Sequence, residues 1–407
     1  MLAEIYPRDH ARFTSLPLLG PHLEGFASWL RSRGYPRLPI RLRIRETPQL
    51  DLRLRRRRVR QLGVLSRAQL LEFAPRVVLD DVYLSALVRS LASYLDERRV
   101  LARPAAGAHE QMVAAYRVYL DRVRGLADPT TRQHCSTASE LLSFLHFDRD
   151  RSVLRRVGPR QIESFVRIAA TRLCRASLQH MVARLRCFLR FLVSRDEIAR
   201  GLDSTVDTPR LYRGEQLPRS LPWEIVQAFL GAIVRSTPKG RRDYAMFVLI
   251  ATYGLRTSEV ASLRLDDIEW RAGQLRVMRS KTKTPAILPL SHEVGAALLD
   301  YLRHARPELP RREVFLRYRS PAGPITAKTV TNAFRDWSRR SGLPIPYQGP
   351  HCLRHSLAVH LLRRGTSLKA IGDLLGHRSA ESTCVYLRLH VDDLRDAALD
   401  LPREVRP

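Results

Sequence analysis

Residues 349–362 read GPHCLRHSLAVHLL and are the most informative run in this chain. Pro350 suits the first turn of a helix, and the leucines after it recur at helical spacing, which predicts a helix with one buried side. His351 and Arg354 are three residues apart and therefore share a face of this helix. Both side chains can address one phosphate from there, so the run predicts an anion-binding helix.

The same run has a second interpretation, a metal site. His351 and His355 are four residues apart, as are the histidines of helical zinc sites. However, no glutamate follows the first histidine, and no third ligand is evident in the sequence. We therefore predict no metal ion here, and we interpret His355 and His360 as hydrogen-bonded structural histidines.

Towards the C-terminus, this helix is followed by a glycine, a histidine and a tyrosine. Gly376 comes after an apolar run that starts near Ser367, and glycine is a common residue just past a helix end. His377 follows where the chain turns, and Tyr386 lies nine residues further on. The chain has 13 tyrosines, and a lone tyrosine is usually a core or interface aromatic, so only its neighbours single out Tyr386.

Towards the N-terminus, the motif Tyr-Gly-Leu-Arg-Thr-Ser-Glu predicts a junction between two helices. Gly254 would end the first helix in the left-handed conformation, and Thr257 or Ser258 would cap the second. Arg256 is either a surface arginine or an anion ligand beside the unpaired N–H groups of a helix start. Glu259 would hold its guanidinium or complement the helix dipole.

Two lysines lie between two predicted strands, Gln274–Arg279 and Ala286–Leu290. Lysines at the tip of a hairpin are usually just solvated. Alternatively, Lys281 is a mobile ammonium that acts as a general acid on a bound phosphate ester. Lys283 is the alternative residue for that role.

The charge of the chain indicates which polyanion supplies the phosphate. Lysine and arginine total 70 against 40 acidic residues, a formal net charge of +30. Such an excess destabilises a compact chain through self-repulsion unless a polyanion neutralises it, and nucleic acid is the first candidate. A ribosome-like or membrane-surface protein, or an arginine-rich source genome, would be the alternatives.

The sequence also bears on the compartment. No run approaches the ~20 apolar residues needed to span a bilayer, and the first residues lack the order of a secretory signal. The five cysteines show no metal-type pairing, and their odd number argues against a disulfide framework. We therefore expect a cytoplasmic protein without a membrane segment.

Taken in order, the Leu-Arg-Thr-Ser-Glu motif, the lysine hairpin, His-x-x-Arg-His, Leu-Gly-His and the tyrosine closely resemble the catalytic domain of tyrosine recombinases (integrases). The resemblance covers about Pro222 to the C-terminus. It covers residues 105–201 more loosely, since these resemble the core-binding domain of that family. The residues to which it assigns catalytic roles are Arg256, Lys281, His351, Arg354, His377 and Tyr386.

The resemblance implies a site-specific recombinase that breaks and rejoins double-stranded DNA. Tyr386 would attack and form a 3′-phosphotyrosyl link, with His351 accepting its proton and Lys281 protonating the departing 5′ oxygen. The link stores the energy of the ester, so neither ATP nor metal nor any other cofactor is required. Consistently, the sequence has no Walker-type glycine loop and no acidic cluster for Mg²⁺.

The resemblance also implies a homotetramer on two DNA sites, acting in the integration, excision or transposition of a mobile element. Residues 391–399 would form an amphipathic segment that docks into a neighbouring subunit; packing on its own domain is the alternative. A type IB topoisomerase and a non-catalytic DNA-binding regulator are the alternative functions. The intact tyrosine and arginines argue against the regulator, and the separate helical domain argues against the topoisomerase.

The sequence predicts a mainly α fold with a small β-sheet, in which a helical, SAM-like core-binding domain precedes a mixed α/β catalytic domain. We predict an N-terminal region over 1–104, the core-binding domain over 105–200, a linker over 201–221 and the catalytic domain over 222–407. The N-terminal region does not match the arm-binding module of phage integrases, and it would bind DNA or a partner. Within it, the alternation in Arg41–Arg45 predicts a strand, and the arginine run Arg53–Arg60 is either a solvated surface or a DNA contact.

Overall fold

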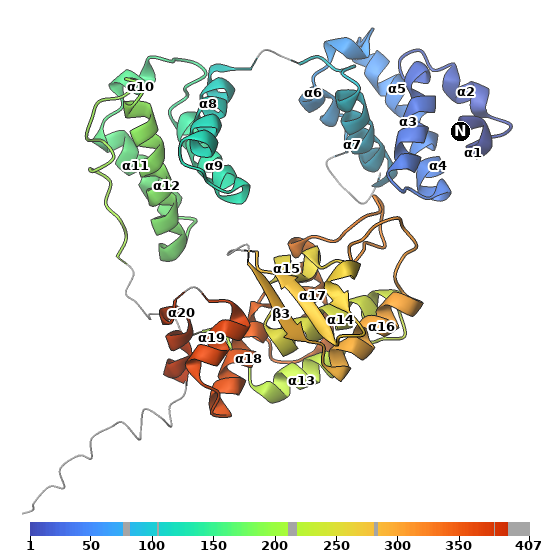
Figure 1. The fold of residues 1–407 in the computed structure, drawn as a ribbon. Helices are drawn as coiled ribbons and strands as arrows, with labels where there is room; N and C mark the ends of the chain where they lie inside the picture. Colours follow the sequence, from blue (N-terminus) through green and yellow to red (C-terminus); the bar gives the residue numbers. More distant parts are fainter. Residues whose placement is uncertain (76–81, 104–105, 211–217, 281–283, 378, 390–407) are drawn as a thin grey trace, which may run out of the picture. The chain divides into compact units, whose positions relative to one another are not determined.

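The structure is a computed structural model that describes residues 1–75, 82–103, 106–210, 218–280, 284–377 and 379–389. In these residues the chain is mainly helical and contains one small antiparallel sheet of three strands (Figure 1). The predicted fold class is confirmed. Within the described part of the chain, no helix is both long and apolar enough to cross a bilayer.

The chain divides into two compact units, 102–215 and, together, 1–101 with 216–407. Separate apolar clusters lie in residues 2–101, 112–206 and 221–353, and a smaller cluster lies in residues 357–386. The domain boundaries proposed from the sequence, at 104, 200 and 221, stay predictions.

Residues 1–101 form helices around a leucine-rich core. Their bounds are α1 (Leu2–Ile5), α2 (His10–Thr14), α3 (Gly20–Ser32), α4 (Arg37–Arg45), α5 (Thr47–Arg56), η1 (Leu62–Val64), α6 (Arg67–Leu71) and α7 (Val82–Glu97). The strand predicted over Arg41–Arg45 is wrong, because these residues end α4. Ile40 and Ile44 are the buried residues of this helix, and their spacing of four outweighs the local alternation of arginine and apolar residues.

The described residues between 106 and 193 are also mainly helical, as predicted for the region 105–200. The helices are α8 (Ala108–Arg122), α9 (Asp128–Phe144), α10 (Val153–Arg156), α11 (Pro159–Ala170) and α12 (Arg175–Val193). Their apolar faces enclose one core, in which the rings of Tyr116, Phe188 and Phe191 pack together with centroids 4.8–6.1 Å apart.

Residues 218–389 combine helices with the sheet. The helices are α13 (Trp223–Gly231), α14 (Pro238–Tyr253), α15 (Thr257–Ser262), η2 (Leu265–Asp267), α16 (His292–His304), α17 (Ala327–Ser341), α18 (His351–Arg363), α19 (Leu368–Leu375), α20 (Glu381–Cys384) and η3 (Val385–Leu389). The strands are β1 (Ile268–Glu269), β2 (Gln274–Met278) and β3 (Pro285–Pro289), in the order β1-β2-β3. The two predicted strands are present, and the two-residue strand β1 was not predicted because it is too short to show alternation.

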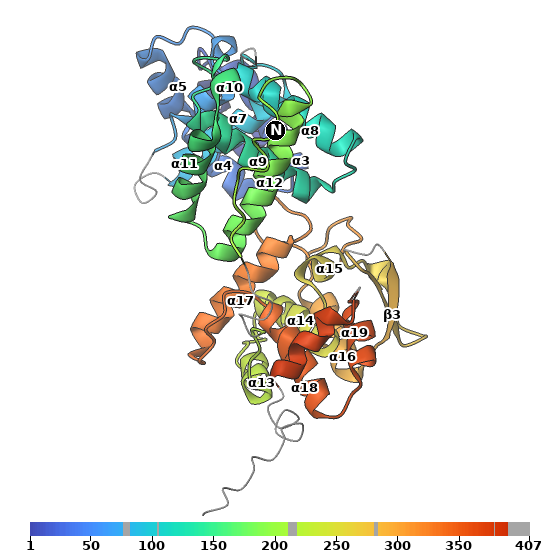
Figure 2. The ribbon, with the colours of Figure 1, turned by 90° about the vertical axis from the view of Figure 1, so that its left-hand side faces the viewer.

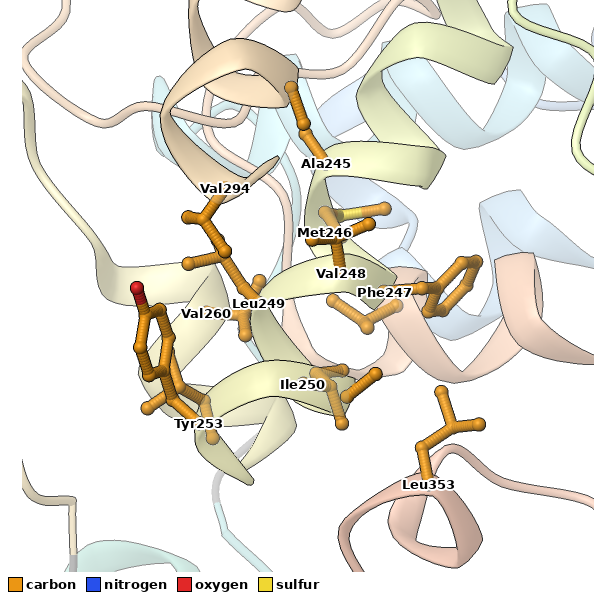
Figure 3. Packing of buried hydrophobic residues seen from close by; sticks show 14 of the residues in the cluster. Ala245, Met246, Phe247, Val248, Leu249, Ile250, Tyr253, Val260, Val294 and Leu353 are labelled. Carbon is orange, nitrogen blue, oxygen red and sulfur yellow. The ribbon is translucent and has the colours of Figure 1, made fainter. Parts of the chain in front are cut away.

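Helix α14 forms the centre of this part of the chain. Its side chains are buried on several sides and point towards α15, α16 and α18 (Figure 3). Because α14 is apolar all round from Ala245 to Ala251, this part of it is a core helix rather than a surface helix. The Tyr253 hydroxyl donates to the carbonyl of Pro289 at 2.6 Å and so joins the end of α14 to β3.

The last turn of α14 leads directly into the residues with predicted catalytic roles. Gly254 has a φ of +61°, and a Cβ at this position would overlap Cδ2 of Leu375. Glycine is therefore required by both conformation and space. The predicted left-handed cap is confirmed, and side chains of α18 and α19 lie beside it. These two helices pack on each other (Figure 2).

Candidate active site

Arg256 lies at the N-cap of α15, where Thr257 or Ser258 had been expected. Its own backbone N–H donates to Oε2 of Glu259 at 2.9 Å, so the glutamate caps the helix from within. The Arg256 guanidinium donates to Glu259 Oε1 at 2.8 Å and to the carbonyl of Gly376 at 3.2 Å. The glutamate thus both caps the helix start and fixes the arginine.

Glu259 is a buried carboxylate that also contacts a second arginine. Arg279, which follows β2, approaches Glu259 Oε2 at 3.4 Å, and the backbone N–H of Ser280 donates to Oε1 at 3.2 Å. Burial opposes ionisation of Glu259, but the hydrogen bonds and charge of Arg256 outweigh it and lower the pKa of this carboxyl. Glu259 is therefore the counter-ion that keeps two guanidinium groups close together.

Arg354 approaches the same place from α18. It is 4% exposed, and its guanidinium donates to the carbonyls of Gly254 and, at 2.7 Å, Leu375. Burial and then the nearby Arg256 lower the pKa of Arg354 to about 10, which leaves it protonated at neutral pH. The structure thus brings the two predicted catalytic arginines together, although 98 residues separate them in the chain.

The end of α19 is what assembles these arginines. Arg279, Arg354 and Arg256 donate to three successive carbonyls, those of Leu374, Leu375 and Gly376. The last carbonyls of a helix lack partners within the helix and carry partial negative charge. Three cations against one carboxylate leave a net positive site, which suits a phosphate group.

His377 follows directly after this helix end. Its Nδ1 lies 2.8 Å from Oγ1 of Thr383, a buried hydroxyl. Burial, followed by Arg354 and Arg256, lowers the pKa of His377 to about 4, so the ring is neutral at pH 7. If the Thr383 hydroxyl donates to Nδ1, the proton of the ring is on Nε2, where it can be donated to a phosphate oxygen.

Tyr386 lies in η3 and is 1% exposed. Its hydroxyl lies 2.9 Å from Nδ1 of His355, and its ring is nearly parallel to that of His377, with centroids 6.3 Å apart. Burial raises the pKa of the phenol, whereas Arg354 lowers it. The tyrosine therefore lies beside the arginine cluster, by which we mean Arg256, Arg279 and Arg354 at the end of α19. Its hydroxyl is the hydrogen-bond partner of His355.

The remaining predicted residues are placed less completely. His351 is exposed and begins α18, one turn before His355. Lys281 and Lys283 lie outside the described residues, as does the segment 391–399. Among the described residues, no group of three or more histidine, cysteine or acidic side chains is arranged to hold a metal ion.

Three residues of this site were not assigned a role in it from the sequence. Arg279 had been taken as the end of a strand and His355 as a structural histidine, and Thr383 had been given no role. Arg279 and His355 act through partners far away in the sequence: Glu259 and Leu374 for Arg279, and Tyr386 for His355. Two features of the sequence could have indicated these residues. Arg279 directly precedes the lysine hairpin, and His355 is the second histidine of His-x-x-Arg-His.

Comparison with known proteins identifies the family of this chain. The Phage integrase family matches residues 221–392. The "Putative integrase/recombinase y4rA" of Sinorhizobium fredii is 33% identical over 406 residues, covering 96% of this chain and 97% of that protein. The Tyrosine recombinase XerD of Listeria monocytogenes is 29% identical over 314 residues, covering 76% of this chain and 95% of that protein.

Solved structures show the same fold. The XerH site-specific recombinase bound to palindromic difH substrate, in its post-cleavage complex, aligns with a TM-score of 0.56 and 16% identity, covering 81% of this chain and 92% of that one. A lambda integrase (75-356) dimer bound to a COC′ core site aligns with a TM-score of 0.52 and 19% identity, covering 73% of this chain and 99% of that one. The chain belongs to the tyrosine recombinase (phage integrase) family, whose members are enzymes that cleave and rejoin DNA.

Proposed function

We propose that this enzyme is a site-specific recombinase that cuts double-stranded DNA through a covalent 3′-phosphotyrosyl intermediate on Tyr386. The observation that carries the proposal is the convergence of Arg256, Arg354 and His377 with Tyr386 at the end of α19. Arginine keeps its proton at neutral pH and its planar group binds two phosphate oxygens at once. Such a cluster can stabilise the charge that develops on a phosphate under attack.

The proposed reaction exchanges one phosphate ester for another. The phenolic oxygen of Tyr386 forms a bond to phosphorus and loses its proton, for which His351 is the proposed acceptor. The bond from phosphorus to the 5′ oxygen breaks, and Lys281, or alternatively Lys283, supplies the proton to the departing hydroxyl. The reverse exchange rejoins the strand, and because the number of ester bonds is unchanged, no nucleotide is consumed.

A nicked duplex tests the covalent step. Such substrates, made from the DNA segments that flank the gene, lose a short fragment after cleavage, so that the protein remains attached to the strand. We expect a covalent adduct on denaturing gels with the native chain and none with Tyr386→Phe, which keeps the ring and lacks the nucleophile. An adduct of equal yield with the phenylalanine variant would refute the assignment.

The same DNA separates a recombinase from an enzyme that only relaxes DNA. We propose that two DNA sites are brought together and exchange strands, in the integration, excision or transposition of a mobile element. Two labelled duplexes of different length would then give recombinant products of new length. Relaxation of supercoiled DNA without such products would instead indicate activity of the topoisomerase type.

We further propose that the enzyme works as a tetramer in which residues 391–399 dock into the neighbouring subunit. In support, one similar structure is a lambda integrase tetramer bound to a Holliday junction, with a TM-score of 0.51 and 18% identity. When residues 390–407 are removed, light scattering should give a mass of the protein–DNA complex that corresponds to fewer than four subunits. A truncated chain that still forms the full assembly would show that the segment packs elsewhere.

For the N-terminal region we propose a role in binding DNA. Residues 37–60 contain ten arginines and two acidic residues. The apolar sides of α4 and α5 are buried in the local core, whereas Arg56, Arg57 and Arg58 are exposed at the end of α5. Exposed guanidinium groups of this density suit the phosphates of a duplex.

Salt dependence tests this role. Each phosphate contact that is lost reduces the slope of log affinity against log salt by about 0.9. The triple variant Arg56→Gln, Arg57→Gln, Arg58→Gln should therefore bind a duplex more weakly and with a shallower slope. A control that removes three exposed arginines of the same region, Arg8, Arg12 and Arg67, should change the slope less; equal slopes for the two variants would argue against the proposal.

A further inference from the structure

The environment of Tyr386 contains a residue to which the proposed reaction assigns no role. The phenol ring lies in an apolar cluster of its own chain, formed with Leu357, Ala358, Val359, Ile371 and Leu375. Its hydroxyl nevertheless has a polar partner, Nδ1 of His355 at 2.9 Å. A buried tyrosine hydroxyl needs such a partner, because the apolar surroundings offer none.

The position of His355 on α18 connects it to the phosphate site. Arg354 is the preceding residue and binds the carbonyls at the end of α19, whereas His355 points to the tyrosine. His351 is four residues earlier and therefore on the same face of the helix as His355. One turn of one helix thus carries a proposed phosphate ligand, the proposed proton acceptor and the partner of the nucleophile.

The surroundings of His355 keep its ring neutral. The charged and titratable groups that act on its ring come from three places: His351 and Arg354 on α18, His377 after α19, and Arg219 before α13. Burial and then these charges lower the pKa of His355 to about 4. A neutral ring that is protonated on Nε2 accepts a hydrogen bond at Nδ1 from the phenol, whose own pKa is raised by burial and which therefore keeps its proton.

We propose that His355 is a positioning residue for the reaction, which holds the Tyr386 hydroxyl at the arginine cluster through its Nδ1 before DNA arrives. The proposal rests on the assignment of Tyr386 as the nucleophile. It accounts for a histidine that lies outside the six predicted catalytic residues. It also explains how a short 3₁₀ turn keeps its tyrosine in place within its own subunit: the ring is held by packing and the oxygen by one hydrogen bond.

The first test needs no DNA. Tetranitromethane nitrates accessible phenols, and peptide mass spectrometry reports each tyrosine separately. His355→Leu places an apolar side chain at this position and removes the hydrogen-bond acceptor. We expect the nitration of Tyr386 to rise at least tenfold in this variant. His355→Gln offers an amide oxygen instead and should restore most of the protection.

Tyr301, whose ring is fully buried in the same domain, serves as the internal reference, so that the measured quantity is the ratio of nitration at Tyr386 to that at Tyr301. A general loosening of the fold would raise the nitration of both tyrosines and leave this ratio unchanged. An unchanged ratio in His355→Leu would overturn the proposal. So would a glutamine variant that is as reactive at Tyr386 as the leucine variant.

The second test measures cleavage of the nicked duplex at saturating protein. A positioning role predicts that His355→Leu slows single-turnover cleavage at least tenfold while the DNA concentration at half saturation stays the same, and that His355→Gln recovers part of the rate. Cleavage at the native rate in the leucine variant would overturn the role. If instead the nitration ratio rises and neither the native chain nor any variant forms an adduct, His355 holds the tyrosine and the proposed function is what fails.

Discussion

The buried carboxylate of Glu259 provides a quantitative test of how the site is held together. It accepts hydrogen bonds from Arg256 and from the backbone of Ser280 and lies beside the charge of Arg279, and its side chain is completely inaccessible to solvent. Glu259→Gln keeps the shape and one acceptor oxygen but leaves two guanidinium groups with no carboxylate. Removing one partner of a buried ion pair typically costs about 3–5 kcal/mol.

A matched control is available in the same domain. Glu269 on β1 pairs with Arg276 at 2.6 Å, but both side chains are largely exposed, and exposed pairs contribute about 0–1 kcal/mol. Glu259→Gln should therefore lower the free energy of unfolding by about 3–5 kcal/mol, and Glu269→Gln should lower it by about 1 kcal/mol or less. Urea denaturation measures both values. Equal losses in the two variants would refute the view that Glu259 is the counter-ion of the arginine cluster.

Three further predictions follow from the same contacts. Gly254→Ala should destabilise the fold more than Gly273→Ala. Both glycines have φ near +60°, but of the two only Gly254 has a side chain, that of Leu375, where the new methyl group would lie. Equal melting temperatures of the two variants would contradict this. The pKa of His355, lowered from 6.5 to about 4, means that the unfolded chain binds a proton at higher pH than the folded chain. The free energy of unfolding should therefore fall as pH drops from 6.5 towards 4, by up to about 3 kcal/mol from this group, and the fall should be smaller in His355→Gln; identical pH profiles would exclude the effect. Thr383→Val removes the hydrogen-bond partner of His377 Nδ1. It should slow DNA cleavage about threefold to tenfold, which corresponds to the free energy of one hydrogen bond, and leave the DNA affinity unchanged. Weaker DNA binding at an unchanged cleavage rate would argue against this.

Much of the local structure could be predicted because its causes are local. Gly254 and Gly376 end helices in the left-handed conformation, as glycine after an apolar helix indicates, and Ser367 caps α19 through its own side chain. The alternation over Arg41–Arg45 was misleading because the cause of the structure there is not local: five residues fit a strand, but Ile40 and Ile44 reach a core formed by distant helices. Secondary structure in such a short run depends on what covers it.

The site itself could be predicted only as a set of residues whose order resembles a known family. The structure shows that Arg256 and Arg354 meet because the carbonyls of Leu375 and Gly376 need donors. The contributions of Arg279 and His355 could not be read from the sequence, since the partners of each lie on other helices. In the sequence alone, Arg279 and His355 do not differ from other arginines and histidines.

The identity of the nucleophile is the claim on which the rest depends, and peptide mapping of the covalent adduct measures it directly. The nicked duplex should be trapped on the native chain, the protein digested, and the nucleotide-bearing peptide sequenced by mass spectrometry. The account predicts one modified side chain, Tyr386, through its phenolic oxygen. A nucleotide on any other tyrosine, or on a serine or histidine of the site, would contradict it.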